Sequence, residues 1–135
     1  MAKLIALDYG TKRTGIAVTD DLQIIASGLT TVASHDLFPF LEKYFTENQV
    51  EAIILGEPKR LDGTDTHSSQ AVRQLKEKLG TTFALPVHMV DERFTSKMAF
   101  QTMIDSGLKK KQRQNKALVD EISATIILQS YLETK

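Results

Sequence analysis

Residues 3–19 read KLIALDYGTKRTGIAVT and contain two apolar runs joined by a short polar link. The apolar run 3–9 ends in Asp-Tyr-Gly, and a short apolar run bounded by turn residues is typical of a strand buried on both faces. Four polar residues, 11–14, separate it from a second apolar run at 15–19. Because this link is so short, the two runs are expected to pair as an antiparallel hairpin.

The rest of the chain alternates between strand and helix patterns. Asp36 is expected to cap a helix with Pro39 in its first turn, where the missing N–H does no harm. Gly80 stands where a glycine commonly ends a helix. Further strands are expected at 24–32, 50–56 and 86–90, and helices at 37–45, 69–79, 96–105 and 117–132. Three leading strands followed by alternation predict an α/β fold, a mixed five-stranded sheet with helices on its faces.

Composition places the protein among soluble globular domains. A length of 135 residues suits a single domain spanning 1–135. The chain has no cysteine, which excludes disulfide scaffolds and thiol nucleophiles and fits a reducing compartment. No segment reaches the roughly 20 apolar residues of a membrane span. We therefore expect a cytoplasmic protein. Seventeen basic residues balance seventeen acidic ones, so any nucleic-acid binding must come from a local patch.

Acidic residues stand at positions that a purely structural fold would not require. Asp8 ends the first strand, and Asp91 and Glu92 end the fifth, with their side chains on opposite faces by strand alternation. Asp120 lies in the apolar stripe of the last helix, beside Ala124, where a carboxylate needs a partner or a metal. The structural alternatives are a turn role for Asp8 and Asp91, and an ion pair for Glu92. For Asp120 the alternative is a buried partner such as Lys12 or Tyr9.

These acids together predict a metal centre. Functional groups gather at the carboxyl ends of strands in open α/β sheets, and the last helix can bring Asp120 to the same edge. Converging carboxylates repel one another, and a hard divalent cation such as Mg²⁺ or Mn²⁺ removes that repulsion. Two such ions about 4 Å apart form the clamp that cleaves phosphodiester bonds.

Basic residues and glycines surround this predicted centre. Five cations fall within residues 109–116, before the helix that carries Asp120, and they are either a solvated loop or a grip for a polyanion. The residues expected to contact nucleic acid are Lys12, Arg13, Lys59, Arg60, Arg93, Lys97, Lys109, Lys110, Lys111, Arg113 and Lys116. Loop roles are expected for Gly10, Gly15, Gly56 and Gly63. Of these, Gly15 leaves room beside Asp8 for a ligand or for a tight backbone contact.

Four motifs in order resemble the YqgF (RuvX) family over essentially the whole chain. Residues 8–17 (DYGTKRTGIA) are similar to its opening D-x-G-x-x-R-x-G-x-A, and 55–58 with 62–64 to its G-L-P…D-G-T loop. Residues 91–96 (DERFTS) are similar to D-E-R-x-T-S. Asp120 with the residues up to Gln129 resembles D-x-x-A-A-x-x-I-L-Q.

The resemblance implies an RNase H-like fold and a nuclease of the bacterial cytoplasm. The family is linked to processing of the 5′ end of precursor 16S ribosomal RNA, and also to Holliday-junction resolution. Its acids correspond to Asp8, the Asp91/Glu92 pair and Asp120. Glu57 departs from the family leucine, and it is either a further metal ligand, as in related nucleases, or a loop residue.

We therefore expect a two-metal nuclease acting on structured RNA, as a monomer or a homodimer. In this scheme Asp8 bridges the ions, and Glu92, or Asp91 in its place, and Asp120 hold one each. The alternatives are a resolvase acting on branched DNA, a ribosome-assembly factor that binds nucleic acid without catalysis, and an actin-like ATPase. The short chain and the lack of a second Asp-Gly phosphate hairpin argue against the ATPase.

Overall fold

A mixed sheet runs through the centre of the computed structural model, which describes residues 2–57, 69–91 and 116–134. Within these ranges the sheet has five strands in the order β3-β2-β1-β4-β5. β1 pairs antiparallel with β2, and β2 with β3, whereas β4 runs parallel to both β1 and β5. The strands are β1 Lys3–Tyr9, β2 Arg13–Thr19, β3 Ala26–Ala33, β4 Val50–Glu57 and β5 Val87–Asp91. The predicted mixed sheet is confirmed.

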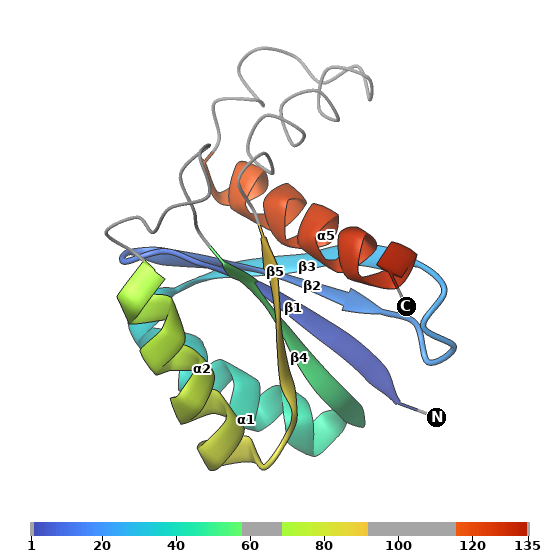
Figure 1. Ribbon diagram of the computed structural model, residues 1–135, viewed down its shortest axis with the longest axis horizontal. Coiled ribbons are helices and arrows are strands. Elements are labelled where there is room, and N and C mark those ends of the chain that lie inside the picture. Colours follow the sequence, from blue (N-terminus) through green and yellow to red (C-terminus); the bar gives the residue numbers. More distant parts are fainter. Residues whose placement is uncertain (1, 58–68, 92–115, 135) are drawn as a thin grey trace.

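Helices cover both faces of this sheet. α1 (Leu37–Glu47) and α2 (Ser69–Phe83) lie on one face, and α5 (Lys116–Thr134) crosses the other (Figure 1). The helix expected at 96–105 lies outside the described residues. None of the described helices is long and apolar enough to cross a membrane.

Alternation along β1 divides the apolar residues into two cores. Ile5 and Leu7 belong to the cluster that includes residues of α1 and α2. Leu4 and Ala6 belong to the cluster that contains Ala124 and its neighbours on α5. Even-numbered positions of β1 therefore face α5, and the next even position is Asp8.

A short 3₁₀ turn, Ser34–Asp36, leads into α1. Asp36 precedes the first helical residue as predicted, and Pro39 lies in the first turn. The Asp36 side chain makes no capping hydrogen bond, since its carboxylate lies 3.5 Å from the ring of His35.

Several sequence-based boundaries were wrong. α2 does not end before Gly80 but continues to Phe83, whose ring packs against Phe38 and Phe45 with centroids 5.7 and 4.9 Å apart. The left-handed residue after the helix is Ala84, with φ of 53°. The tertiary packing of the Phe83 ring therefore outweighs the tendency of Gly80 to end the helix. β2 begins at Arg13 instead of residue 15, and β4 continues one residue past its expected end at 56, so Gly56, which was assigned a loop role, lies inside the strand.

Candidate active site

Gly15 brings α5 into direct contact with β2. It is the register partner of Asp8, and directly opposed residues on antiparallel strands point to the same face. A Cβ atom at position 15 would collide with the carbonyl of Asp120 and would stand 2.9 Å from the amide nitrogen of Glu121. Of the two roles expected for Gly15, the structure therefore supports the tight backbone contact. Gly15 is a strand residue and not a loop residue, and through it Asp8 and Asp120 share one side of the sheet.

Asp120 forms an ion pair with Arg13. The Nε of Arg13 donates to Oδ2 of Asp120 at 3.0 Å, and the two side chains are 40% and 25% exposed. Lys12 and Tyr9 were the examples of a structural partner considered from sequence, and the structure pairs Asp120 with Arg13 instead. Arg13 could have been found from strand alternation, because it lies two residues before Gly15 on the same face of β2. The sequence prediction started β2 too late and left Arg13 in the loop.

The turn between β1 and β2 is fastened to the residues before α1. The Gly10 amide donates to the Arg13 carbonyl at 2.9 Å, and a Cβ at Gly10 would lie 2.7 Å from that same oxygen. The Ser34 hydroxyl donates to the Gly10 carbonyl, and the Ser34 amide donates to the Lys12 carbonyl at 2.9 Å. Gly10 is thus the turn glycine that was predicted. The turn fixes the position of the Arg13 backbone at the end of the sheet where β1 ends and β2 begins.

Glu57 and Asp91 belong to the other side of the sheet. They are register partners at the ends of β4 and β5. Leu55 packs in the α1–α2 core and Ile54 in the α5 core, so alternation along β4 directs Glu57 away from α5. Asp91, as the partner of Glu57, takes the same side. Neither residue shares the face of Asp8, which argues against Glu57 as a ligand beside it.

The chemistry of the donors suits a hard cation, although the described residues do not complete a site. Asp8 and Asp120 offer carboxylate oxygens on one face, which are the ligands that Mg²⁺ and Mn²⁺ prefer. Within 2–57, 69–91 and 116–134, no three His, Asp or Glu residues lie close enough to hold one ion. Glu92, expected as the third ligand, lies outside these ranges.

Most of the predicted basic residues also lie outside the described ranges. Lys12 is exposed in the β1–β2 turn, and Arg13 pairs with Asp120. Lys116 opens α5, but its side chain is not described. The remaining predicted contacts lie outside the described residues, as does Gly63: they are Lys59, Arg60, Arg93, Lys97, Lys109, Lys110, Lys111 and Arg113.

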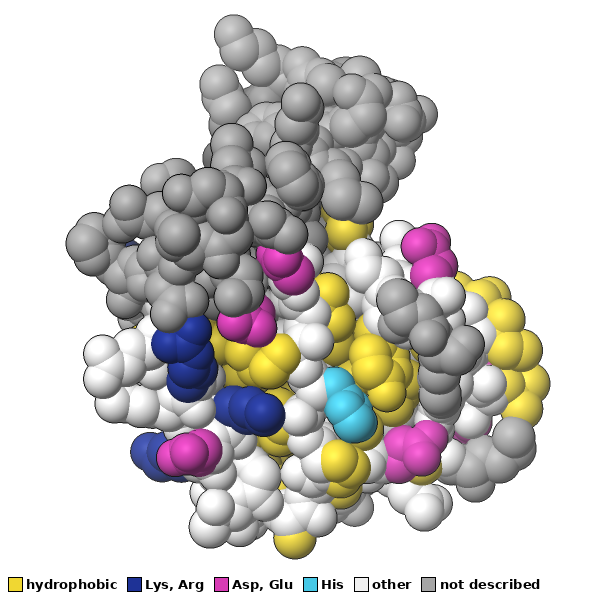
Figure 2. Space-filling model, viewed as in Figure 1, with side chains coloured by type: hydrophobic (Ala, Val, Ile, Leu, Met, Phe, Trp, Pro, Cys, Tyr) yellow, Lys and Arg dark blue, Asp and Glu magenta, His cyan; other side chains and the backbone are white. Residues whose placement is uncertain are grey.

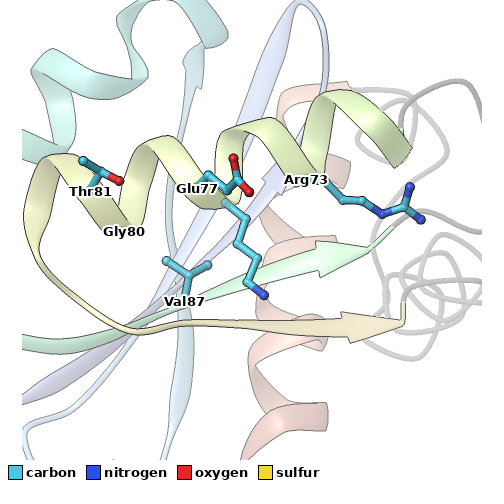
Figure 3. Close-up of a pocket in the computed structure, with 6 residues that line it drawn as sticks. Arg73, Glu77, Gly80, Thr81 and Val87 are labelled. Carbon is cyan, nitrogen blue, oxygen red and sulfur yellow. The ribbon is translucent and has the colours of Figure 1, made fainter.

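A groove of about 590 Å³ lies between α2 and β5, and two basic residues that were not predicted from sequence as nucleic-acid contacts line it. It is lined by Arg73, Lys76, Glu77, Gly80, Thr81 and Val87. Figure 3 shows Arg73 extending toward the carboxyl ends of β4 and β5. Figure 2 shows acidic and basic side chains gathered near the end of β5 and over α2. The groove lies on the α1–α2 side of the sheet and is separate from the Asp8–Asp120 face. Arg73 and Lys76 sit three apart on α2, a helical spacing that could have revealed them.

Comparisons with known proteins give the chain a family. The model of the RuvX family, described as Holliday junction resolvase, matches residues 2–134. A relative from Flavobacterium psychrophilum, named "Putative pre-16S rRNA nuclease", is 60% identical over 136 residues and covers 100% of this chain and 99% of its own. A relative of the same name from Christiangramia forsetii is 60% identical over 133 residues, 98% of each chain.

Among solved structures, Thermus thermophilus RuvC in complex with a Holliday junction substrate is similar in fold. The TM-score is 0.58 at 14% sequence identity, and the match covers 99% of this chain and 96% of that one. At this identity the likeness extends to the fold alone, which is RNase H-like as the resemblance to the family implied. Because the family model and full-length relatives both span it, the chain belongs to the RuvX family.

Proposed function

We propose that the protein is a metal-dependent nuclease that hydrolyses phosphodiester bonds in structured RNA, with Asp8 and Asp120 at its centre. The observation that carries this proposal is the Gly15 contact, which brings the strand-end Asp8 and the helical Asp120 to one side of the sheet. The names of the relatives support precursor 16S ribosomal RNA as the substrate.

Asp8, Asp120 and Glu92 are the residues that would hold one or two Mg²⁺ or Mn²⁺ ions. Glu92 is chosen over Asp91 because Asp91 pairs in register with Glu57, away from α5, and the sequence pattern leads us to expect the two neighbouring acids on opposite faces. A bound cation of this kind supplies a hydroxide nucleophile and stabilises charge on the leaving oxygen. The protein must hold the carboxylates in fixed positions, and the packing of α5 against Gly15 fixes the position of Asp120.

The basic residues would bind backbone phosphates rather than take part in the chemistry. The run from Lys109 to Lys116 precedes the helix that carries Asp120, and Arg73 adds a cation near the ends of β4 and β5. Neutralising Lys109, Lys110 and Lys111 together should reduce the salt dependence of RNA binding by about 2 units of logarithmic slope, at ~0.7 per lost phosphate contact. An unchanged slope would mean that the run is only solvated.

Cleavage assays test the proposal directly. Precursor 16S RNA should be cut by the wild-type protein in Mg²⁺ but not in chelator, and Asp120→Asn should lose this cleavage. Glu42→Gln, an exposed change on α1 that also removes one negative charge, is the matched control and should cut normally. The description of the family favours a second candidate, a resolvase that acts on four-way DNA, so a junction substrate belongs in the same assay. Cleavage of neither substrate would favour a binding factor without catalysis.

A further inference from the structure

The ion pair between Arg13 and Asp120 joins a predicted phosphate contact to a predicted metal ligand. Arg13 opens β2 and Asp120 lies near the start of α5, 107 residues later in the chain. The contact is a 3.0 Å hydrogen bond from Nε of Arg13 to Oδ2 of Asp120. One oxygen of a carboxylate expected to bind a divalent cation is therefore already bound by a cation of the protein itself.

Arg13 lies on the side of the sheet that carries Asp8 and Asp120. It precedes Gly15 by two residues in β2, and Gly15 is the register partner of Asp8. The guanidinium thus shares a face with both carboxylates. Two carboxylates on one face repel each other where no cation lies between them, and a fixed positive charge offsets that repulsion.

The ion pair between Arg13 and Asp120 can be broken at low energetic cost, so that each side chain can bind another partner. Both side chains are partly exposed, at 40% and 25%, and ion pairs of this kind contribute little to the free energy of folding. A guanidinium released from a carboxylate presents planar donors that match the geometry of a phosphate. Loss of the ion pair would thus leave Arg13 ready for a second partner at the same edge.

We propose that Arg13 is an internal counterion that competes with divalent metal for Asp120. In the metal-free protein it neutralises Asp120 and holds the carboxylate in position. When Asp120 exchanges this partner for a divalent cation, Arg13 becomes available to a phosphate of the nucleic acid. Arg13 is therefore a positioning residue that couples metal binding to substrate binding. This inference rests on the proposed metal-dependent function.

Mn²⁺ binding to the whole protein without nucleic acid tests the competition. Free Mn²⁺ is measured by electron paramagnetic resonance in titrations of wild type, Arg13→Gln, Arg13→Lys and Lys12→Gln. The Lys12→Gln variant is the matched control, since it removes the same charge from the adjacent, exposed position. Arg13→Gln should bind Mn²⁺ roughly two- to fivefold more tightly than Lys12→Gln, as expected for release of a partly exposed ion pair. Arg13→Lys, which keeps the charge, should remain close to wild type.

Each other result contradicts the inference in a distinct way. Weaker Mn²⁺ binding by Arg13→Gln than by Lys12→Gln would mean that Arg13 assists metal binding by holding Asp120, and equal binding would mean that the pair does not compete. Thermal melts in chelator verify that every variant is folded. If all variants bind Mn²⁺ like wild type and RNA cleavage still requires Mg²⁺, only this inference fails. If no variant binds Mn²⁺, the proposed metal dependence fails with it.

Discussion

The carbonyl oxygen of Asp120 fills the space where any residue other than glycine at position 15 would carry its Cβ atom. Gly15→Ala should therefore push the first turns of α5 away from β2, because backbone atoms cannot move aside as a flexible side chain can. We expect a loss of about 1–3 kcal/mol in the free energy of unfolding, the usual cost of overpacking. Cleavage should fall with it, since Asp120 moves relative to Asp8. Denaturant unfolding and the RNA assay measure the two effects.

Gly80→Ala is the control for that substitution. Gly80 lies inside α2, where the nearest atoms to an added Cβ are the Leu85 carbonyl oxygen at 3.7 Å and a methyl of Val87 at 3.9 Å. Alanine in a helix interior is more favourable than glycine, so this variant should gain about 0.5–1 kcal/mol. If both glycine variants changed stability alike, the close approach of α5 to β2 would be wrong.

Asp120→Asn should change stability little in the absence of metal. Asparagine keeps the shape of the side chain and removes one negative charge from the side that also carries Asp8. The ion pair that is lost is partly exposed, so the free energy of unfolding in chelator should change by less than about 1 kcal/mol. Mg²⁺ should raise the melting temperature of wild type more than that of the variant, because ligands stabilise the form that binds them. A loss of several kcal/mol in chelator would instead make Asp120 a structural residue.

Asp20 confers a pH dependence on the β2–β3 connection. The amides of Ile25 and Ile24 donate to its Oδ1 at 2.9 and 2.8 Å, and these bonds hold the pKa of the Asp20 carboxyl below its ordinary value of 3.8. Since the folded pKa is the lower one, the stabilisation is present above pH 3.8 and disappears as the pH falls through the folded pKa. An NMR titration of the Asp20 carboxyl should give a midpoint under 3.8, and a midpoint at or above that value contradicts this account. Asp20→Asn should remove the dependence.

Much of the sheet could be predicted from sequence because β1, β2, β4 and β5 are short apolar runs with turn residues near their ends, whereas β3 (ASGLTTVA) alternates only loosely. The antiparallel pairing of β1 with β2, the mixed character of the sheet and the strand-end position of Asp8 follow from that pattern. The pairing of Arg13 with Asp120 does not, because it depends on where α5 lies across β2. That placement depends on the contact at Gly15, and one glycine in a strand does not reveal which backbone approaches it.

The end of α2 was mispredicted for a related reason. Gly80 predicted a helix end because glycine commonly follows the last helical residue. The ring of Phe83 instead packs between residues of α1, and such long-range contacts cannot be predicted from the local sequence pattern. Alternation along β4 could have separated Glu57 from Asp8 beforehand, since Glu57 follows Leu55 on the α1–α2 side.

Thr19 supplies a buried hydrogen bond at the start of β1. Its hydroxyl accepts the amide of Leu4 at 2.8 Å, and the two residues are 2% and 1% exposed. The bond lies where the register between β1 and β4 shifts, between Lys3 and Leu4. Thr19→Val keeps the volume and removes the acceptor, so the Leu4 amide is left buried without a partner. That costs about 1–3 kcal/mol of unfolding free energy.

Hydrogen exchange at the Leu4 amide distinguishes this effect from a simple packing change. In Thr19→Val the amide should exchange faster than the global loss of stability explains, because its own acceptor is gone. Thr19→Ser is the matched control, since it deletes a methyl group but keeps the hydroxyl, and its Leu4 amide should exchange no faster than its own loss of stability predicts. Equal exchange in the two variants would show that the Leu4 amide does not depend on the Thr19 oxygen, and that the strand is held there by packing alone.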